Sequence, residues 1–282
     1  MAGPTSTVLT RSIAKPAAPA AARPAAQRAQ RSLLHSARAV ALNASEAFLT
    51  LVSPPQDGRS EAPGRLRGPV VTTTEQYGSF YDEKRAESDL KRFQEKGARP
   101  WTATLIEALK AEGVEGATLL DIGGGVGAID HELLAAGVAH ATCVDASAGY
   151  LDAARAEGER RGHAERMTFR HGDFVELAES VPPADIVTLD RVINVYPDWE
   201  RLLGLSAARA RRLYGLVYPR DTRFVRLVVF AMNLALRLRR KPVRASVHPA
   251  NAIERVRREN GLTPNVSANA GPAWQVAVYR RL

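Results

Sequence analysis

The pattern of apolar and polar positions divides the chain of 282 residues into a patterned part, from about residue 75 onward, and a first part without a sustained apolar period. In the patterned part, short apolar runs bounded by turn residues predict buried strands, and apolar residues three and four positions apart predict helices between them. The expected strands are 118–122, 141–145, 167–171, 185–189, 213–218, 263–268 and 274–280. The expected helices among them are 126–136, 147–161, 198–209, 222–239 and 249–260. This alternation with short links is typical of a doubly wound α/β sheet.

A helical cap is expected before the first strand, over residues 75–113. A charged helical stretch is followed there by apolar residues at helical spacing from Trp101 to Leu109. Tyr77 and Tyr81 stand at the start of this cap and are candidates to line a ligand pocket, with packing as the alternative.

The first 70 residues are rich in Ala, Arg, Pro and Ser, with nine Arg or Lys against three acidic residues. Such a segment buries too little apolar surface to offset its ordering entropy. We expect a disordered extension over residues 1–70, either transit-like or the product of a mispredicted start, and one folded domain over residues 71–282. The cytoplasm is the expected location, and organellar import through the extension is the alternative.

The charge is divided unevenly along the patterned part. Residues 71–200 hold 13 basic and 24 acidic residues, whereas residues 201–282 hold 17 basic and three acidic residues. A basic region of this kind indicates an anionic substrate, an anionic membrane surface or nucleic acid, unless its arginines only solvate helix faces. No specific nucleic-acid partner is expected. The single cysteine, Cys143, excludes a disulfide framework and a cysteine-based metal site, and we expect no metal.

The expected helix 222–239 contains a nearly continuous apolar run from Leu227 to Leu236, with arginine and lysine on both sides. A helix with these flanks can rest on an anionic membrane surface through residues 223–241 or cover a greasy substrate. The alternative is a helix that covers the sheet and has an unusually apolar outer face. No apolar run approaches the roughly 20 residues that a transmembrane helix requires.

The segment from Leu119 to Gly127 carries the clearest chemical signal. Its order of apolar residues, an acid and a glycine run predicts a buried strand that breaks into a tight turn and opens a helix. Open α/β sheets bind nucleotide-like ligands at such a turn. Asp145 follows the glycines at the sequence separation at which an acid binds a ribose hydroxyl in these folds. A turn that uses glycine only for close packing is the alternative.

Two acids favour a sulfonium cofactor over a dinucleotide. Asp121 directly precedes the glycines, where a carboxylate suits an ammonium group better than a pyrophosphate. Asp173 and Phe174 follow the third strand, where they can bind an adenine amino group and cover its ring. An NAD(P)-dependent oxidoreductase remains the rival enzyme class, although no Tyr-x-x-x-Lys or comparable hydride-transfer set is recognisable.

This ordered set of residues resembles the class I S-adenosylmethionine-dependent methyltransferases over residues 75–282. The resemblance implies a Rossmann-like seven-stranded sheet with helices on both faces and an antiparallel last strand. It implies S-adenosylmethionine as cofactor and a small-molecule methyl acceptor, with these contact residues: Asp121, Gly123, Gly125, Gly127, Asp145, Asp173 and Phe174. A methyltransferase fold that has lost catalysis and serves as a binding subunit is the non-enzymatic alternative.

A looser resemblance concerns the acceptor side. The Tyr196-Pro197 turn, the Pro219-Arg220 turn and the Arg244–His248 stretch together look like magnesium-protoporphyrin O-methyltransferase and its relatives. Val195 stands where that pattern often has histidine, so the resemblance does not carry the porphyrin substrate.

Candidate catalytic residues follow the fourth and fifth strands: Asp190, Tyr196 and Arg220. The hypothesis is in-line methyl transfer to an oxygen, nitrogen or carbon atom of the acceptor. One option for this atom is a carboxylate or hydroxyl oxygen of a hydrophobic anionic molecule. His171, Tyr196 and His248 are the candidate bases. The sequence gives no oligomeric state.

Overall fold

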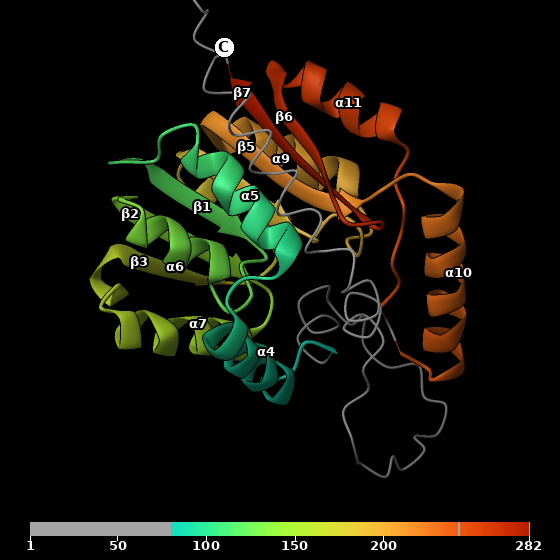
Figure 1. Cartoon of the computed structure of the whole chain (residues 1–282), viewed down its shortest axis with the longest axis horizontal. Coiled ribbons are helices and arrows are strands. Elements are labelled where there is room, and N and C mark those ends of the chain that lie inside the picture. The colour runs from blue at the N-terminus through green and yellow to red at the C-terminus, as the bar shows by residue number, and fades with distance from the viewer. Residues whose placement is uncertain (1–79, 242, 282) are drawn as a thin grey trace, which may run out of the picture.

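The computed structural model describes residues 80–241 and 243–281, which form one seven-stranded mixed sheet with helices on both faces (Figure 1). The strands follow the order β3-β2-β1-β4-β5-β7-β6 across the sheet. β1 to β5 run parallel, and β7 is antiparallel to both of its neighbours. The strands are β1 (Thr118–Ile122), β2 (His140–Asp145), β3 (Met167–His171), β4 (Ala184–Asp190), β5 (Ala210–Pro219), β6 (Leu262–Ala270) and β7 (Trp274–Arg281). The predicted fold class is confirmed.

Helices occupy the connections between the strands, as the sequence pattern predicts. They are α4 (Glu83–Lys96), α5 (Pro100–Lys110), α6 (Ala128–Ala135), α7 (Ala148–Arg161), α8 (Phe174–Leu177), α9 (Trp199–Arg209), α10 (Arg223–Leu238) and α11 (Ala250–Glu259). Ser147 caps α7 as expected, because its hydroxyl accepts a hydrogen bond from the Tyr150 N–H. The expected helix at 126–136 begins two residues late, since Gly127 adopts a positive φ of 75°.

The core lies in two layers, one on each face of the sheet. Along β1, Leu119 packs with α5 and α6 on one face, and Leu120 packs with α9 and α11 on the other. Buried strands with both faces covered place successive side chains on opposite sides in this way. The predicted cap consists of α4 and α5, and Phe93 on α4 packs with Tyr150 on α7. The expectations for residues 1–70 and for Tyr77 lie outside the described residues.

The order of the strands also locates a crevice. The connection from β1 leads to β2 on one side of it, and β4 returns on its other side. The connections after β1 and β4 therefore run to opposite sides, which opens a gap between the carboxyl ends of these two neighbouring strands. Ligands bind at this gap in open α/β sheets. α10 stands at the periphery, to the right in Figure 1, between the end of β5 and the segment that leads to α11. Within the ranges that the structure describes, no helix has the length and apolar character to cross a bilayer.

Candidate functional site

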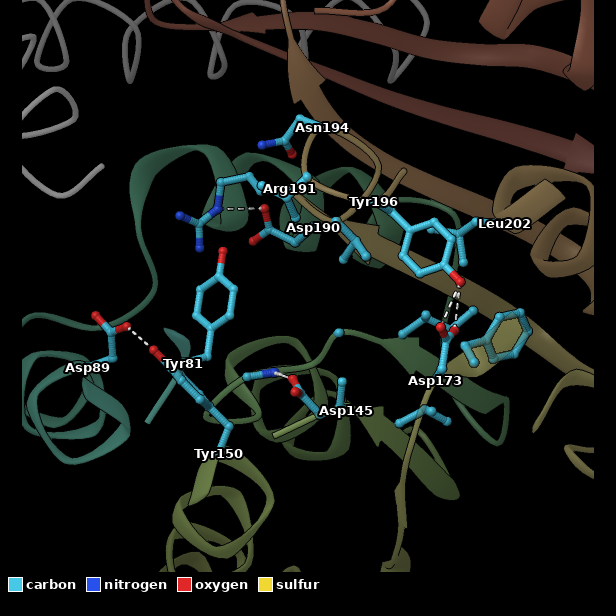
Figure 2. A pocket seen from close by; sticks show the side chains of 18 of the residues that line it. Tyr81, Asp89, Asp145, Tyr150, Asp173, Asp190, Arg191, Asn194, Tyr196 and Leu202 are labelled. Carbon is cyan, nitrogen blue, oxygen red and sulfur yellow. Dashed lines mark hydrogen bonds and ion pairs between the residues drawn. The ribbon is translucent and has the colours of Figure 1, made fainter. Parts of the chain in front are cut away.

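A cavity of about 220 Å³ opens at the carboxyl ends of β1, β2 and β4 (Figure 2). Its wall combines the glycine turn after β1, acids after the neighbouring strands, and aromatic and arginine side chains from α4, α7 and the loop after β4. These lining residues include Tyr81, Arg85, Asp89, Arg99, Gly123, Gly125, Asp145, Tyr150, Asp173, Phe174, Asp190, Arg191, Val192, Asn194, Tyr196, Leu202 and Trp274. The cavity therefore lies at the edge of the sheet where the sequence predicts the ligand.

The glycine turn brings main-chain atoms to the surface of the cavity. Gly123 and Gly125 line it, both with positive φ, whereas Gly127 lies behind the turn at the start of α6. A Cβ on Gly123 would stand 2.5 Å from Cγ2 of Val192, so this position tolerates no side chain without movement of the cavity wall. Two of the three predicted glycines are thus cavity residues, and the third shapes the turn.

Asp145 links the glycine turn to the next helix. Its Oδ2 accepts a hydrogen bond from the Gly125 N–H at 3.0 Å, and its Oδ1 accepts one from the Ser147 N–H at 2.8 Å. Burial raises the pKa of this carboxyl above its ordinary value, and the two N–H donors oppose that shift. The predicted ribose acid therefore lies in the cavity, held rigidly by two main-chain groups.

Asp173 and Phe174 form the cavity wall beyond Asp145, as expected, but the carboxylate already has partners. The Tyr196 hydroxyl lies 2.9 and 2.8 Å from its two oxygens, and the Val175 N–H donates to Oδ1 at 2.9 Å, which caps α8 (Figure 2). Phe174 is buried against α9. A ligand amino group would share the Asp173 carboxylate with Tyr196.

Asp121 does not have the position that its place before the glycines suggests. Its side chain is 1% exposed, lies under the turn rather than in the lining of the larger cavity, and accepts a hydrogen bond from the Thr188 hydroxyl at 2.7 Å. It borders only a smaller adjoining cavity of about 90 Å³. Burial, with neighbouring Asp130, raises its pKa well above the ordinary range, and burial raises the pKa of Asp130 to about 7. In this structure Asp121 therefore lies beneath the glycine turn, outside the lining of the larger cavity.

A network of charges and aromatic rings surrounds the mouth of the cavity, and the sequence did not reveal it. Asp89 on α4 binds both Arg99, at 3.0 Å, and the Tyr150 hydroxyl, at 2.6 Å. Arg191 adopts a left-handed φ of 62° and pairs with Asp190 at 3.2 Å. Its guanidinium also lies over the rings of Trp101 and Trp274, at 5.2 and 5.9 Å from their centroids.

Of the three catalytic candidates, two line the cavity. Asp190 accepts a hydrogen bond from the Thr102 hydroxyl, and Tyr196 binds Asp173. Arg220 lies outside the lining of the cavity, where its main-chain N–H binds the Ala273 carbonyl and its guanidinium reaches the Pro272 carbonyl.

The two histidine candidates also lie elsewhere. His171 contacts the Ala146 carbonyl at 3.1 Å, and buried His248 contacts the Ile193 carbonyl at 2.8 Å and stacks on Trp199. Over the described ranges, no cluster of three His, Cys, Asp or Glu side chains is arranged to hold a metal.

Comparison with known proteins gives one family match. Residues 119–211, from β1 to the start of β5, match the family described as a methyltransferase domain. Ribosomal protein L11 methyltransferase of Yersinia pseudotuberculosis is 29% identical over 136 residues, which are 46% of this chain and 46% of that protein. The chain therefore spans about half the length of the curated relatives that it matches.

Solved structures share the fold at low sequence identity. An O-methyltransferase family protein from Burkholderia thailandensis has a TM-score of 0.59 and 15% identity over 89% of this chain and 70% of its own. Human N-acetylserotonin methyltransferase, solved with S-adenosylmethionine, has a TM-score of 0.53 and 16% identity over 91% of this chain and 67% of its own. Magnesium protoporphyrin IX methyltransferase from Synechocystis, solved with S-adenosylhomocysteine, has a TM-score of 0.50 and 17% identity over 78% of this chain and 90% of its own. The architecture built above is that of these proteins.

Proposed function

We propose that this chain, a class I S-adenosylmethionine-dependent methyltransferase, transfers a methyl group to an oxygen of a small, largely apolar molecule that carries a negative charge. The observation that carries the methyl-donor side is Asp145, which is fixed by Gly125 and Ser147 at the cavity surface beside the glycine turn. The matched family domain spans this same region of the chain.

The residues of the cavity fit the cofactor in three parts. Asp145 offers a carboxylate to ribose hydroxyls, and Asp173 with Phe174 offers an acceptor and a ring to the adenine. Gly123 and Gly125 allow main-chain atoms to approach the ligand closely, because they have no side chain. A Cβ on Gly123 would in addition collide with Val192. Arg99 supplies positive charge at the other end of the cavity, where the cofactor's own carboxylate can be bound.

The acceptor side supports an apolar and anionic substrate. Val192, Leu202 and Trp274 present apolar surface to the cavity. The lining holds three arginines, Arg85, Arg99 and Arg191, and four acids, Asp89, Asp145, Asp173 and Asp190. Asp145, Asp173 and Arg99 are assigned to the cofactor in this proposal, so the other two arginines are the groups that remain to bind an anionic acceptor.

The chemistry requires little from the protein beyond placement. When bound, S-adenosylmethionine supplies an activated methyl group. Trp274, Val192 and Tyr196 exclude water from the acceptor, and Arg191 orients its charge. Asp190, held by Thr102 and Arg191, is the cavity carboxylate available to accept a proton when the acceptor is a hydroxyl. A carboxylate acceptor has no proton to lose and needs no such base.

Calorimetry with the full chain tests the cofactor. S-adenosylhomocysteine and S-adenosylmethionine are titrated separately, with NAD as the competing ligand. Binding of the first two without NAD supports the proposal. Binding of NAD alone would replace it with an oxidoreductase, and no binding of any ligand would leave a methyltransferase fold without this chemistry.

An activity screen tests the acceptor. Methyl-labelled S-adenosylmethionine is incubated with the protein and with separated apolar and protein fractions of a cell extract, and labelled products are identified by mass spectrometry. Label in small anionic molecules is the expected result. Label confined to protein would contradict the small-molecule proposal and agree with the activity named for the Yersinia relative.

A further inference from the structure

α10 exposes a continuous apolar stripe. Its five large apolar side chains that face solvent are between 49% and 77% exposed and recur every three or four residues: Phe224, Leu227, Phe230, Leu234 and Leu238. Val225 and Met232 occupy the opposite face and are buried. Single exposed apolar residues are ordinary on protein surfaces, whereas a stripe along one helix marks an interaction surface.

Positive charge surrounds this stripe. From Thr222 to Ile253 the chain holds seven Arg or Lys residues and no acidic residue. Arg226 pairs with Asp221 at the start of the helix. Exposed Arg237, Arg239, Arg240 and Lys241 gather at its other end. The apolar stripe and its cationic border together suit a surface that is apolar inside and negatively charged outside.

Hydrogen bonds connect α10 to the wall of the cavity. The Asn233 side chain binds the main chain of Ala245 twice, through Nδ2 to the carbonyl at 2.7 Å and through Oδ1 from the N–H at 2.9 Å. The Ser246 N–H then donates to the carbonyl of Asn194, a cavity residue, at 2.6 Å. The position of α10 is therefore tied to the cavity through the segment 243–248.

We propose that α10 lies flat on an anionic lipid bilayer through this stripe and thereby holds the mouth of the cavity next to the membrane. A 16-residue helix is too short to cross the hydrocarbon core but long enough to rest along its surface. The like charge argues against a second copy of the chain as the occupant. A two-fold interface would place the same basic border against itself.

Co-sedimentation of the full chain with vesicles tests the surface. Binding is expected to vesicles that contain phosphatidylglycerol, much less to pure phosphatidylcholine, and to weaken as salt rises. The double variant Phe230→Ser, Leu234→Ser is expected to bind at least about ten-fold more weakly, because it loses two exposed apolar side chains that the bilayer would cover. Equal binding of the variant, or equal binding to both lipids, overturns the proposal.

A charge pair provides a matched control. Arg239→Gln with Arg240→Gln removes two charges at the border of α10 and is expected to weaken binding about ten-fold or more. Arg170→Gln with Arg211→Gln removes two exposed charges, from β3 and from the start of β5, and is expected to change binding little. If both double variants lose the same amount of vesicle binding, the binding depends only on net charge and the proposed site on α10 is overturned. A wild-type dimer that the Phe230→Ser, Leu234→Ser variant converts to a monomer would assign the stripe to a second copy instead.

Hydrogen exchange tests the connection to the cavity. Vesicles are expected to protect amides of α10 and of 243–248 in the wild type. In Asn233→Ala the stripe is intact, so vesicle binding and protection of α10 are expected to remain while protection of 243–248 is lost. Unchanged protection of that segment would refute the link. Because no step uses methyl transfer, failure here is distinguishable from failure of the proposed function.

Discussion

Substitution of Asp145 by asparagine separates the two tasks that the structure gives this carboxylate. The two oxygens accept N–H groups of Gly125 and Ser147, and the same carboxylate faces the cavity. Asparagine keeps the shape but has one acceptor oxygen and one NH₂ group. The NH₂ group must therefore face one of the two N–H donors and lose that bond.

The magnitude follows from these bonds. A hydrogen bond to a charged group contributes about 1.5–3 kcal/mol, so one lost bond in the turn costs the fold about that much. A ribose diol that also donates to this carboxylate loses a comparable amount, which corresponds to a roughly 10- to 150-fold weaker dissociation constant. The fold and the ligand are affected separately, so both must be measured.

Calorimetric titration of S-adenosylhomocysteine into the variant gives the binding effect, and thermal unfolding without ligand gives the stability effect. We expect affinity at least about ten-fold weaker and a Tm lower by about 3–10 °C. Asp152→Asn is the matched control, because Asp152 lies on α7, is exposed and, among the described residues, forms an ion pair with Arg155 at the surface. It is expected to change neither quantity appreciably.

The pH dependence adds a second test. Burial raises the pKa of Asp145, so wild-type affinity is expected to decline as the solution is acidified toward that pKa, and the variant is expected to lack this decline. A variant with a lowered Tm and unchanged affinity would refute the reasoning, because Asp145 would then build the turn without touching the ligand.

Three further predictions concern stability and are measured by urea unfolding. Gly127→Ala is expected to cost about 3 kcal/mol, from a φ of 75° and a Cβ 2.9 Å from the buried His131 ring, whereas Gly125→Ala, whose Cβ would meet Tyr150 only at 3.6 Å, costs about 1–2 kcal/mol; equal costs would contradict this. Glu157→Gln is expected to lose about 2 kcal/mol at neutral pH. Arg160, with Gln94 and Arg161, lowers the Glu157 pKa to about 2, so this difference is present above the unfolded value and disappears as pH falls toward 2; a difference independent of pH would exclude the ion pairs as its source. The stability of Asp130→Asn is expected to fall less than that of the wild type as pH rises from about 4 to about 7. Burial raises the Asp130 pKa to about 7, above its unfolded value, so the wild type loses the stability of this neutral buried carboxyl through that range, whereas Asp121, whose pKa is also raised, contributes in both proteins; parallel profiles would contradict the assignment.

The sequence predicted the strands to within a few residues, and the physical reason is visible in β1. Leu119 and Leu120 face opposite layers of the core, so an uninterrupted apolar run was required there. Asp145 was predictable as well, because the end of β2 and the glycine turn after β1 meet wherever the two strands are parallel neighbours. These features depend on local pattern and on one rule of topology.

Two other candidate residues lie outside the lining of the larger cavity, because the direction of their side chains is set by distant partners. Asp121 lies outside the larger cavity since Thr188, on the adjacent strand β4, donates to it and Asp130 lies beside it. Arg220 stays outside the cavity because the Pro272 and Ala273 carbonyls lie within its reach. The spacing of residues along the sequence does not predict these contacts, because the partners are far apart in the chain.

The distribution of charge gains a structural meaning that composition alone could not give. The acidic part of the chain, residues 71–200, nevertheless supplies the three cavity arginines, Arg85, Arg99 and Arg191. The basic part supplies α10, which lies outside the lining of the cavity and is tied to it by segment 243–248. The molecule thus has two separate cationic features, the arginines inside the cavity and the basic border of α10 outside it. An acceptor that is apolar and anionic satisfies both, because its charge suits the arginines and its apolar part concentrates it in the bilayer where α10 is proposed to rest.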